Sequence, residues 1–252
     1  MAKPAVILVG GDKGGVGKTT VARTLIDYFG TNQTPTRAFD TDCPRGTLKR
    51  FHPDVTEVVD VTSASDQMKI FDTLGSADAK VTVIDVRAGL LSPTLQALSD
   101  IGFLESVKKG QIAFAMFHIL GPSITSLEEI AETARFVSDA NHFLVKNHIN
   151  ETPFFEWDPA TYKSYFKRIK DAQEITIPKL NEMACEQVEV AGVSYVSFVA
   201  NKNAKGEVVN NSFVLRGYVR HWLGQVWGEF DRVKLLELAS PKLERNLRQI
   251  AG

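Results

Sequence analysis

The chain has 252 residues, of which 44% are hydrophobic and 23% are charged, a composition that excludes collagenous, disordered and disulfide-scaffold proteins. Its 29 basic and 30 acidic residues give a net charge of −1, so any contact with nucleic acid or a membrane has to come from a local patch. The two cysteines, Cys43 and Cys185, have no metal-site or disulfide-framework spacing, which favours a reducing, cytoplasmic environment.

Short apolar runs alternate with longer amphipathic segments along the chain. This alternation is typical of a mostly parallel sheet with helices on both faces, so we predict one three-layer α/β domain over 1–252. The predicted strands are residues 5–10, 36–40, 80–86, 111–118, 142–147 and 194–200. The predicted helices follow Thr20 and cover 92–108, 123–140 and 211–230. The segment 148–180 is less regular, and we expect it to be an insertion or a partner surface.

A glycine-rich segment, GGDKGGVGKTT over residues 10–20, lies between the first apolar run and the first amphipathic segment. Glycines let a backbone turn tightly around an anion, and the helix that follows adds its positive end. We therefore expect a phosphate loop in which Lys18 reaches the β and γ phosphates and Thr19 holds Mg²⁺. A turn that binds nothing is the disfavoured alternative. The expected nucleotide-binding residues of the loop are Gly14, Gly15, Val16, Gly17, Lys18, Thr19 and Thr20.

The loop departs from the general phosphate-loop pattern at its start, where Asp12 stands at the first glycine position and Lys13 follows. In this it resembles the deviant Walker A motif of the ParA/MinD family of P-loop ATPases. The resemblance implies a P-loop NTPase fold, the cofactors ATP and Mg²⁺, and slow hydrolysis of ATP. It also implies an ATP-bound homodimer in which Lys13 reaches the partner's phosphates as a catalytic cation. A solvated loop lysine is the alternative.

The second apolar run continues as FDTDCP, which is similar to the family's switch I segment. The similarity implies that Asp42 orients or activates the attacking water and that Asp40 lies near Mg²⁺. Two turn aspartates that close a strand are the alternative. Arg45 follows the proline, where the family often has glutamine.

The run VTVID ends in Asp85 and looks like the family's Walker B strand. This implies that Asp85 holds Mg²⁺ through water, and a lone carboxylate at the end of a buried strand needs such a cation or donors. The sequence then departs from the family, with Arg87 open to three roles: a phosphate contact, a partner contact or a surface arginine. Gly89 is expected to offer a backbone N–H to the γ-phosphate.

Two later segments resemble the family's base-binding elements. Asn147 closes the apolar run 142–147, and its amide offers a donor and an acceptor to an adenine edge. A turn asparagine is the alternative. Pro178, in ITIPKL, resembles the family's proline loop that flanks the base.

The surface on which such a switch acts is left open by the sequence. Nonspecific double-stranded DNA is the first candidate, because Arg216 and Arg220 have near-helical spacing in a mildly basic segment. An ordinary solvated helix face is the alternative. The tail 241–250 has three apolar anchors and no aromatic one, which disfavours membrane attachment. The aromatic stretch 153–166 would suit docking to a protein complex.

These patterns favour an ATP-dependent dimerisation switch of the ParA type that partitions or positions a cargo complex on DNA. An activator or cargo protein is the expected partner. The alternatives are an accessory ATPase of conjugative transfer, a MinD-like protein that positions a complex on a membrane, and a metabolic P-loop enzyme that uses ATP to activate a small molecule.

Overall fold

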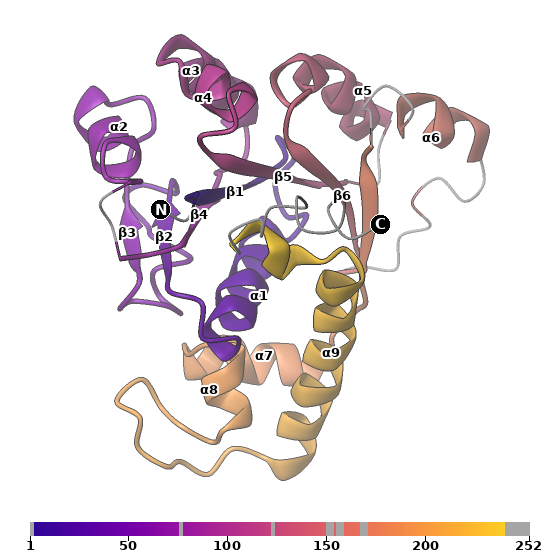
Figure 1. The fold of residues 1–252 in the computed structure, drawn as a ribbon. Helices are drawn as coiled ribbons and strands as arrows, with labels where there is room; N and C mark the ends of the chain where they lie inside the picture. Colours follow the sequence, from indigo (N-terminus) through magenta and orange to yellow (C-terminus); the bar gives the residue numbers. More distant parts are fainter. Residues whose placement is uncertain are drawn as a thin grey trace, which may run out of the picture.

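The computed structural model of the chain describes residues 3–75, 78–121, 124–149, 154, 159–166 and 171–239 (Figure 1). The strands are β1 (Ala5–Gly10), β2 (Thr36–Asp40), β3 (Thr56–Val58), β4 (Val81–Asp85), β5 (Ala113–Ile119), β6 (Asn141–Asn147) and β7 (Gln173–Ile177). The helices are α1 (Lys18–Thr31), α2 (Ala64–Phe71), α3 (Leu91–Asp100), α4 (Phe103–Lys108), α5 (Ile124–Thr133), η1 (Ala134–Phe136), α6 (Pro159–Phe166), α7 (Glu182–Ala191), α8 (Tyr195–Val199), α9 (Phe213–Arg232) and η2 (Leu235–Leu238).

Within the described residues, seven parallel strands form one sheet in the order β3-β2-β4-β1-β5-β6-β7. Helices α2, α3, α4 and α5 cover one face, and α1, α7, α8 and α9 cover the other (Figure 1). The predicted three-layer α/β fold is therefore confirmed. Among the described helices, none is long and apolar enough to cross a membrane.

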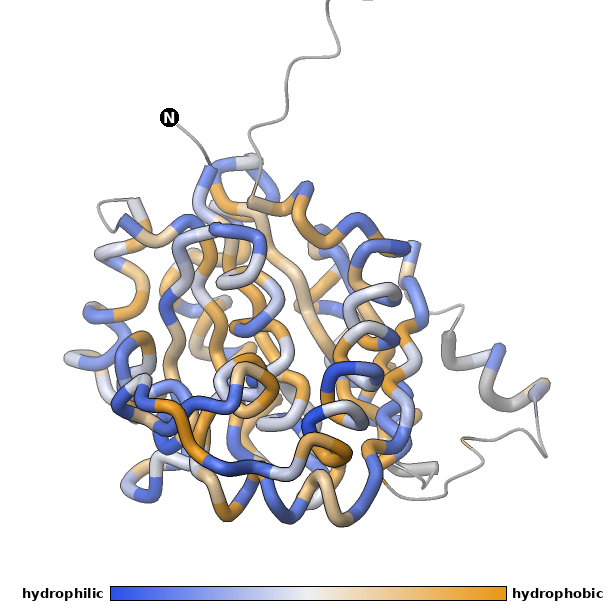
Figure 2. Tube along the Cα trace, turned by 90° about the horizontal axis from the view of Figure 1, so that it is seen from below, coloured by the Kyte–Doolittle hydropathy of each residue, from blue (hydrophilic) through white to orange (hydrophobic). Residues whose placement is uncertain are grey.

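The central strand β1 explains why the buried strands read as continuous apolar runs. Ile7 and Val9 pack into the core shared with α1, α7, α8 and α9, whereas Val6 and Leu8 pack against α2, α3 and α4. Both faces of the strand are buried, so no polar alternation remains. Figure 2 views the molecule from the side on which α7 and α8 lie in Figure 1, and polar and hydrophobic residues alternate along the chain there, as expected for helices with one buried face.

The parallel register brings the carboxyl ends of the central strands to one edge of the sheet. Val9 pairs with Asp85, and Asp40 pairs with the same residue from the other side. Asn147, at the end of β6, pairs with Ile177 of β7. Open parallel sheets bind ligands at this edge, and the loop between β1 and α1 leaves from it.

Three predicted elements differ from the structure. The expected strand 194–200 is wrong: it is helix α8, because the Ser194 hydroxyl accepts the Ser197 N–H and Asp27 accepts the Tyr195 N–H, which caps a helix start. The expected helix 92–108 is two helices, α3 and α4, separated at Gly102, whose φ of 74° is left-handed. Residues 134–140 of the third predicted helix form η1 and a turn.

Six of the described elements lie outside the predicted set: β3, α2, α6, β7, α7 and η2. Strand β3 has three residues and helix α2 has eight, lengths at which periodicity carries little signal. Strand β7 lies inside the segment 148–180, so the end of that segment belongs to the sheet. Most of the aromatic stretch 153–166 and the tail 241–250 lie outside the residues whose side chains are described.

Candidate functional site

The segment between β1 and α1 forms a tight loop. Gly15 has a φ of 75° and Gly17 a φ of 86°, both left-handed conformations that favour glycine. Helix α1 begins at Lys18 with no side chain capping its first turn, so its first N–H groups can take an anion. Gly14 and Gly15 are exposed, Val16 and Lys18 are buried, and Gly17, Thr19 and Thr20 are half-buried.

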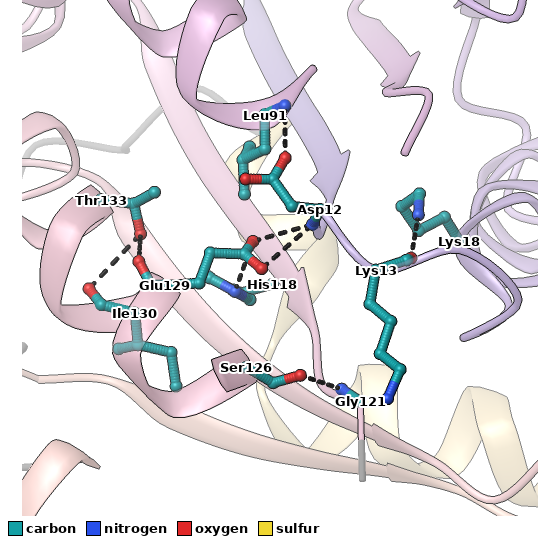
Figure 3. A network of polar contacts seen from close by, with 10 residues as sticks. All are labelled: Asp12, Lys13, Lys18, Leu91, His118, Gly121, Ser126, Glu129, Ile130 and Thr133. Atoms are coloured by element: carbon teal, nitrogen blue, oxygen red, sulfur yellow. Dashed lines mark hydrogen bonds and ion pairs between the residues drawn. The ribbon is translucent and has the colours of Figure 1, made fainter. Parts of the chain in front are cut away.

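The Lys18 side chain is only 8% exposed, and its Nζ donates to the Lys13 carbonyl oxygen at 2.7 Å (Figure 3). Burial lowers the pKa of Lys18, and the carboxylates of Asp85, Glu129 and Asp12 oppose that shift. The lysine is thus held at the loop by a carbonyl, an oxygen acceptor that a phosphate oxygen can replace.

Asp85, at the end of β4, is fully buried beside the start of α1. The Thr19 hydroxyl donates to its Oδ2 at 2.7 Å, and its Oδ1 has no hydrogen-bond partner. Burial raises the pKa of Asp85 to about 7, against the lowering effect of the Thr19 hydrogen bond. A buried carboxylate oxygen without a partner, next to a threonine hydroxyl, is the oxygen donor pair that a hard cation such as Mg²⁺ prefers.

The segment that follows β2, predicted to resemble switch I, is built on Asp40, which is fully buried at the end of that strand. Its carboxylate accepts the N–H groups of Asp42 at 2.9 Å and Leu48 at 2.6 Å, which shapes the loop that follows. Asp42 accepts the Thr47 hydroxyl at 2.8 Å, and its other oxygen lies 3.6 Å from Arg87 Nε. Arg87 therefore contacts the segment that follows β2. The catalytic role of Asp42 and the magnesium role of Asp40 stay predictions.

The residues expected near the base contact other parts of the chain. Asn147 is buried, and its Nδ2 donates to the Val16 carbonyl at 3.0 Å. A Cβ on Gly17 would lie 2.1 Å from that Nδ2, so the asparagine packs directly on the loop. The Pro178 carbonyl accepts Trp222 Nε1 at 2.6 Å, which joins the end of β7 to α9. Their contacts with a base stay predictions.

Lys13 is exposed, and its side chain extends toward Gly121, just after β5 (Figure 3). Its reach across a dimer stays a prediction. The Gly89 N–H, expected at a γ-phosphate, donates to the Asp12 carbonyl at 3.0 Å.

A contact that the sequence reasoning missed lies behind the loop. The Asp12 N–H donates to both carboxylate oxygens of Glu129, at 3.0 Å each, and Glu129 Oε1 lies 3.1 Å from His118 Nε2 (Figure 3). Asp12 and Glu129 are 117 positions apart, so no local motif links them. In the predicted helix 123–140, Glu129 has helical spacing with the buried residues Ser126, Ile130 and Thr133, a pattern that does not point to the loop.

The two arginines of the predicted DNA patch differ in exposure on α9. Arg220 is exposed, whereas Arg216 is half-buried and its Nη1 donates to the Val199 carbonyl at 3.4 Å. Arg220 is therefore the better placed of the pair for contact with a phosphate backbone.

Comparison with known proteins places the fold. No family model matches the sequence, and neither does any curated protein. The MinD cell division protein of Aquifex aeolicus is 14% identical with a TM-score of 0.51, over 88% of this chain and 97% of that one. The septum site-determining protein MinD of Pyrococcus horikoshii OT3, solved with Mg-ADP, is 14% identical with a TM-score of 0.51, over 94% and 98%. The chain therefore has the P-loop NTPase fold of the MinD structures.

Proposed function

We propose that the chain is a slow, Mg²⁺-dependent ATPase that dimerises when it binds ATP. The observation that carries the proposal is the edge of the sheet at β1 and β4, where an uncapped helix start, a buried Lys18 and the Thr19–Asp85 pair converge. One MinD structure of the same fold was solved with Mg-ADP, which supports a nucleotide at this edge.

Each side chain of the edge has a chemical task in this proposal. Lys18 exchanges the Lys13 carbonyl for the β and γ phosphate oxygens, an exchange of one oxygen acceptor for a charged one. Thr19 and the partnerless oxygen of Asp85 would hold Mg²⁺, directly or through water. When bound, the ion neutralises charge on the phosphates. Asp42 orients the attacking water once it is released from Arg87.

Dimerisation is the regulatory half of the proposal. Lys13 is exposed at the rim of the loop, where a second copy of the chain would meet it. Its ammonium group would then offset charge on the partner's transferred phosphoryl group. ATP shifts the population toward the dimer as far as it binds the dimer-competent state more tightly than the other.

The dimer is proposed to act in partition or positioning of a cargo complex on DNA, with an activator or cargo protein as partner. Arg220 is exposed, and within the described part of the chain it shows no hydrogen bond to backbone like the one that Arg216 makes to Val199. Two copies of the patch in a dimer would bind phosphates more tightly than one, and binding of this kind weakens as salt rises.

The first test measures retention of the Asp42→Ala variant on nonspecific duplex DNA with ATP, with ADP or without nucleotide, at one low salt concentration. Asp42→Ala is expected to stop hydrolysis and to hold the ATP dimer. We expect retention with ATP only, and loss of it as salt rises. Arg220→Ala is expected to abolish retention, whereas Arg232→Ala, whose guanidinium already pairs with Glu229, leaves it in place.

Light scattering separates the two halves of the proposal. If the protein dimerises with ATP but is not retained on DNA, DNA is not the surface on which it acts. ATP-dependent dimerisation would then still hold. A monomer in every nucleotide state, for the wild type and for Asp42→Ala, would remove the switch itself. Equal hydrolysis by the wild type and Asp42→Ala would take Asp42 out of its proposed role.

A further inference from the structure

Asp12 links the phosphate loop to two other parts of the chain. Its N–H donates to both oxygens of Glu129 on α5. Its carbonyl accepts the Gly89 N–H at 3.0 Å, and its carboxylate Oδ1 accepts the Leu91 N–H at 3.0 Å (Figure 3). One residue thus ties the loop to α5 on one side and to the turn 86–91 on the other.

The carboxylate of Asp12 fills a need of helix α3. That helix begins at Leu91, and its N-cap residue is Leu90, which has no side chain that can accept a hydrogen bond. Helix starts leave N–H groups without intrahelical partners, and a carboxylate is a preferred acceptor there. Asp12 supplies the acceptor from 79 positions away. The general phosphate-loop pattern has glycine at this position, and glycine has no side chain that could accept the hydrogen bond.

Glu129 fixes the other side of Asp12. Its side chain is 10% exposed, and both of its oxygens are within 3.0 Å of the same N–H. His118, fully buried on β5, lies against the same carboxylate at 3.1 Å. The glutamate is therefore packed between the loop and the sheet, where it has little freedom to move.

We infer that Asp12 is a positioning residue that fixes the turn 86–91 against the phosphate loop, with Glu129 holding Asp12 in place. The inference rests on the proposed ATPase function. The turn continues directly from Asp85, and in the proposed function it would border the third phosphate, which ADP lacks. Residues 14–19, which in the proposed function would contact the phosphates that ADP and ATP share, make none of the hydrogen bonds of Asp12 described above. Asp12 should therefore matter for ATP turnover and not for ADP binding.

The test compares Asp12→Ala with Asp12→Asn, which keeps an oxygen that can accept the Leu91 N–H. For Asp12→Ala we expect kcat to fall about tenfold while the Kd for ADP stays within about twofold of the wild type, the size expected for one charge-assisted hydrogen bond. Asp12→Asn should recover most of kcat. Thermal unfolding of each nucleotide-free variant confirms that it is folded.

Glu129→Gln tests the support behind Asp12, with Glu128→Gln as its matched control. Glu128 is the adjacent residue of α5 and is exposed. Glu129→Gln keeps one acceptor oxygen, so we expect kcat to fall about threefold with the ADP affinity unchanged. Glu128→Gln should match the wild type in both measurements.

Hydrogen exchange at the Leu91 amide gives a readout that needs no nucleotide. Exchange should be faster in Asp12→Ala than in the wild type and close to the wild type in Asp12→Asn. If the wild type neither binds nor hydrolyses ATP, the proposed function fails, and this exchange still decides whether Asp12 fixes the turn. Unchanged exchange in Asp12→Ala, or equal losses of ADP binding and kcat, would overturn the inference.

Discussion

Replacing Asp27 with asparagine is expected to remove a large part of the pH dependence of the protein's stability. Asp27 lies on the buried side of α1, where its Oδ2 accepts the Tyr195 N–H at 2.9 Å and so caps α8. Burial raises the pKa of Asp27 to about 7, although the Val196 N–H and Arg23 lower it in part. An asparagine oxygen can accept the same backbone N–H and carries no charge.

The direction and the size of the expected change in stability with pH follow from the pKa values of Asp27 in the folded and unfolded states. The folded pKa of about 7 is above the ordinary pKa of 3.8, so the folded state binds more protons than the unfolded state between these values, and stability falls as pH rises. With 1.36 kcal/mol per pKa unit, the ionisation penalty grows by about 2.5 kcal/mol between about pH 5 and pH 8. Asp85, whose pKa is also raised to about 7, contributes in the same range and remains in the variant.

The assay is urea unfolding of the nucleotide-free wild type and Asp27→Asn at several pH values across that range. The quantity of interest is the difference in the free energy of unfolding between the two proteins, because the other titrating groups are common to both. We expect this difference to shift by about 2.5 kcal/mol in favour of the variant as pH rises. Asp54→Asn, an exposed carboxylate in the loop before β3, should show no such shift.

A difference that stays constant from low to high pH would refute the reasoning, because Asp27 would then ionise equally in the folded and unfolded states. A shift in the opposite direction would mean that Arg23 outweighs burial. Loss of folded protein in Asp27→Asn at every pH would show that the N–H groups of α8 need a charged acceptor, which Asp27→Glu would test.

Three further substitutions have expected outcomes. Gly17→Ala puts a Cβ 2.1 Å from Asn147 Nδ2 at a left-handed φ, and should lower stability by at least about 2 kcal/mol and abolish ADP binding, as measured by unfolding and titration. Arg23→Ala removes a buried guanidinium that pairs with Glu189, and should cost about 3 kcal/mol in urea unfolding. Trp222→Phe removes the indole hydrogen bond to the carbonyl after β7 and should cost about 1 kcal/mol; an unchanged unfolding midpoint in any of the three would contradict its stated cause.

The strands of the sheet centre could be predicted because burial on both faces leaves an apolar run in the sequence. Residues 5–10 and 36–40 match β1 and β2 in full, and 80–86 contains β4. The segment 194–200 has the same apolar character but is helical, because its capping groups come from Ser194 and from Asp27, far away on α1. Tertiary contacts of this kind override local propensity.

The tight glycine loop between β1 and α1 could be predicted because its residues are contiguous and the left-handed φ of Gly15 and Gly17 favours glycine; phosphate binding by this loop stays a prediction. For the carboxylates of Asp40 and Asp85, the sequence could predict only that each lies at the end of a strand. The sequence could not tell that Arg87 pairs with Asp42, or that Asn147 donates to the loop backbone, since both contacts depend on which strands are neighbours. The residue pattern of a single strand does not determine which strands become its neighbours in a parallel sheet.

Asp12 illustrates how a departure from a motif can have a structural cause. The general phosphate-loop pattern has glycine there, and the sequence alone offers no reason for an aspartate. In the fold, α3 begins at Leu91 after the N-cap residue Leu90, whose side chain cannot accept a hydrogen bond. The aspartate supplies an acceptor, and the glycines Gly14, Gly15 and Gly17 follow it in the loop. The group that caps α3 therefore lies in the loop and not in the helix itself. This contact couples the position of the loop to the position of α3.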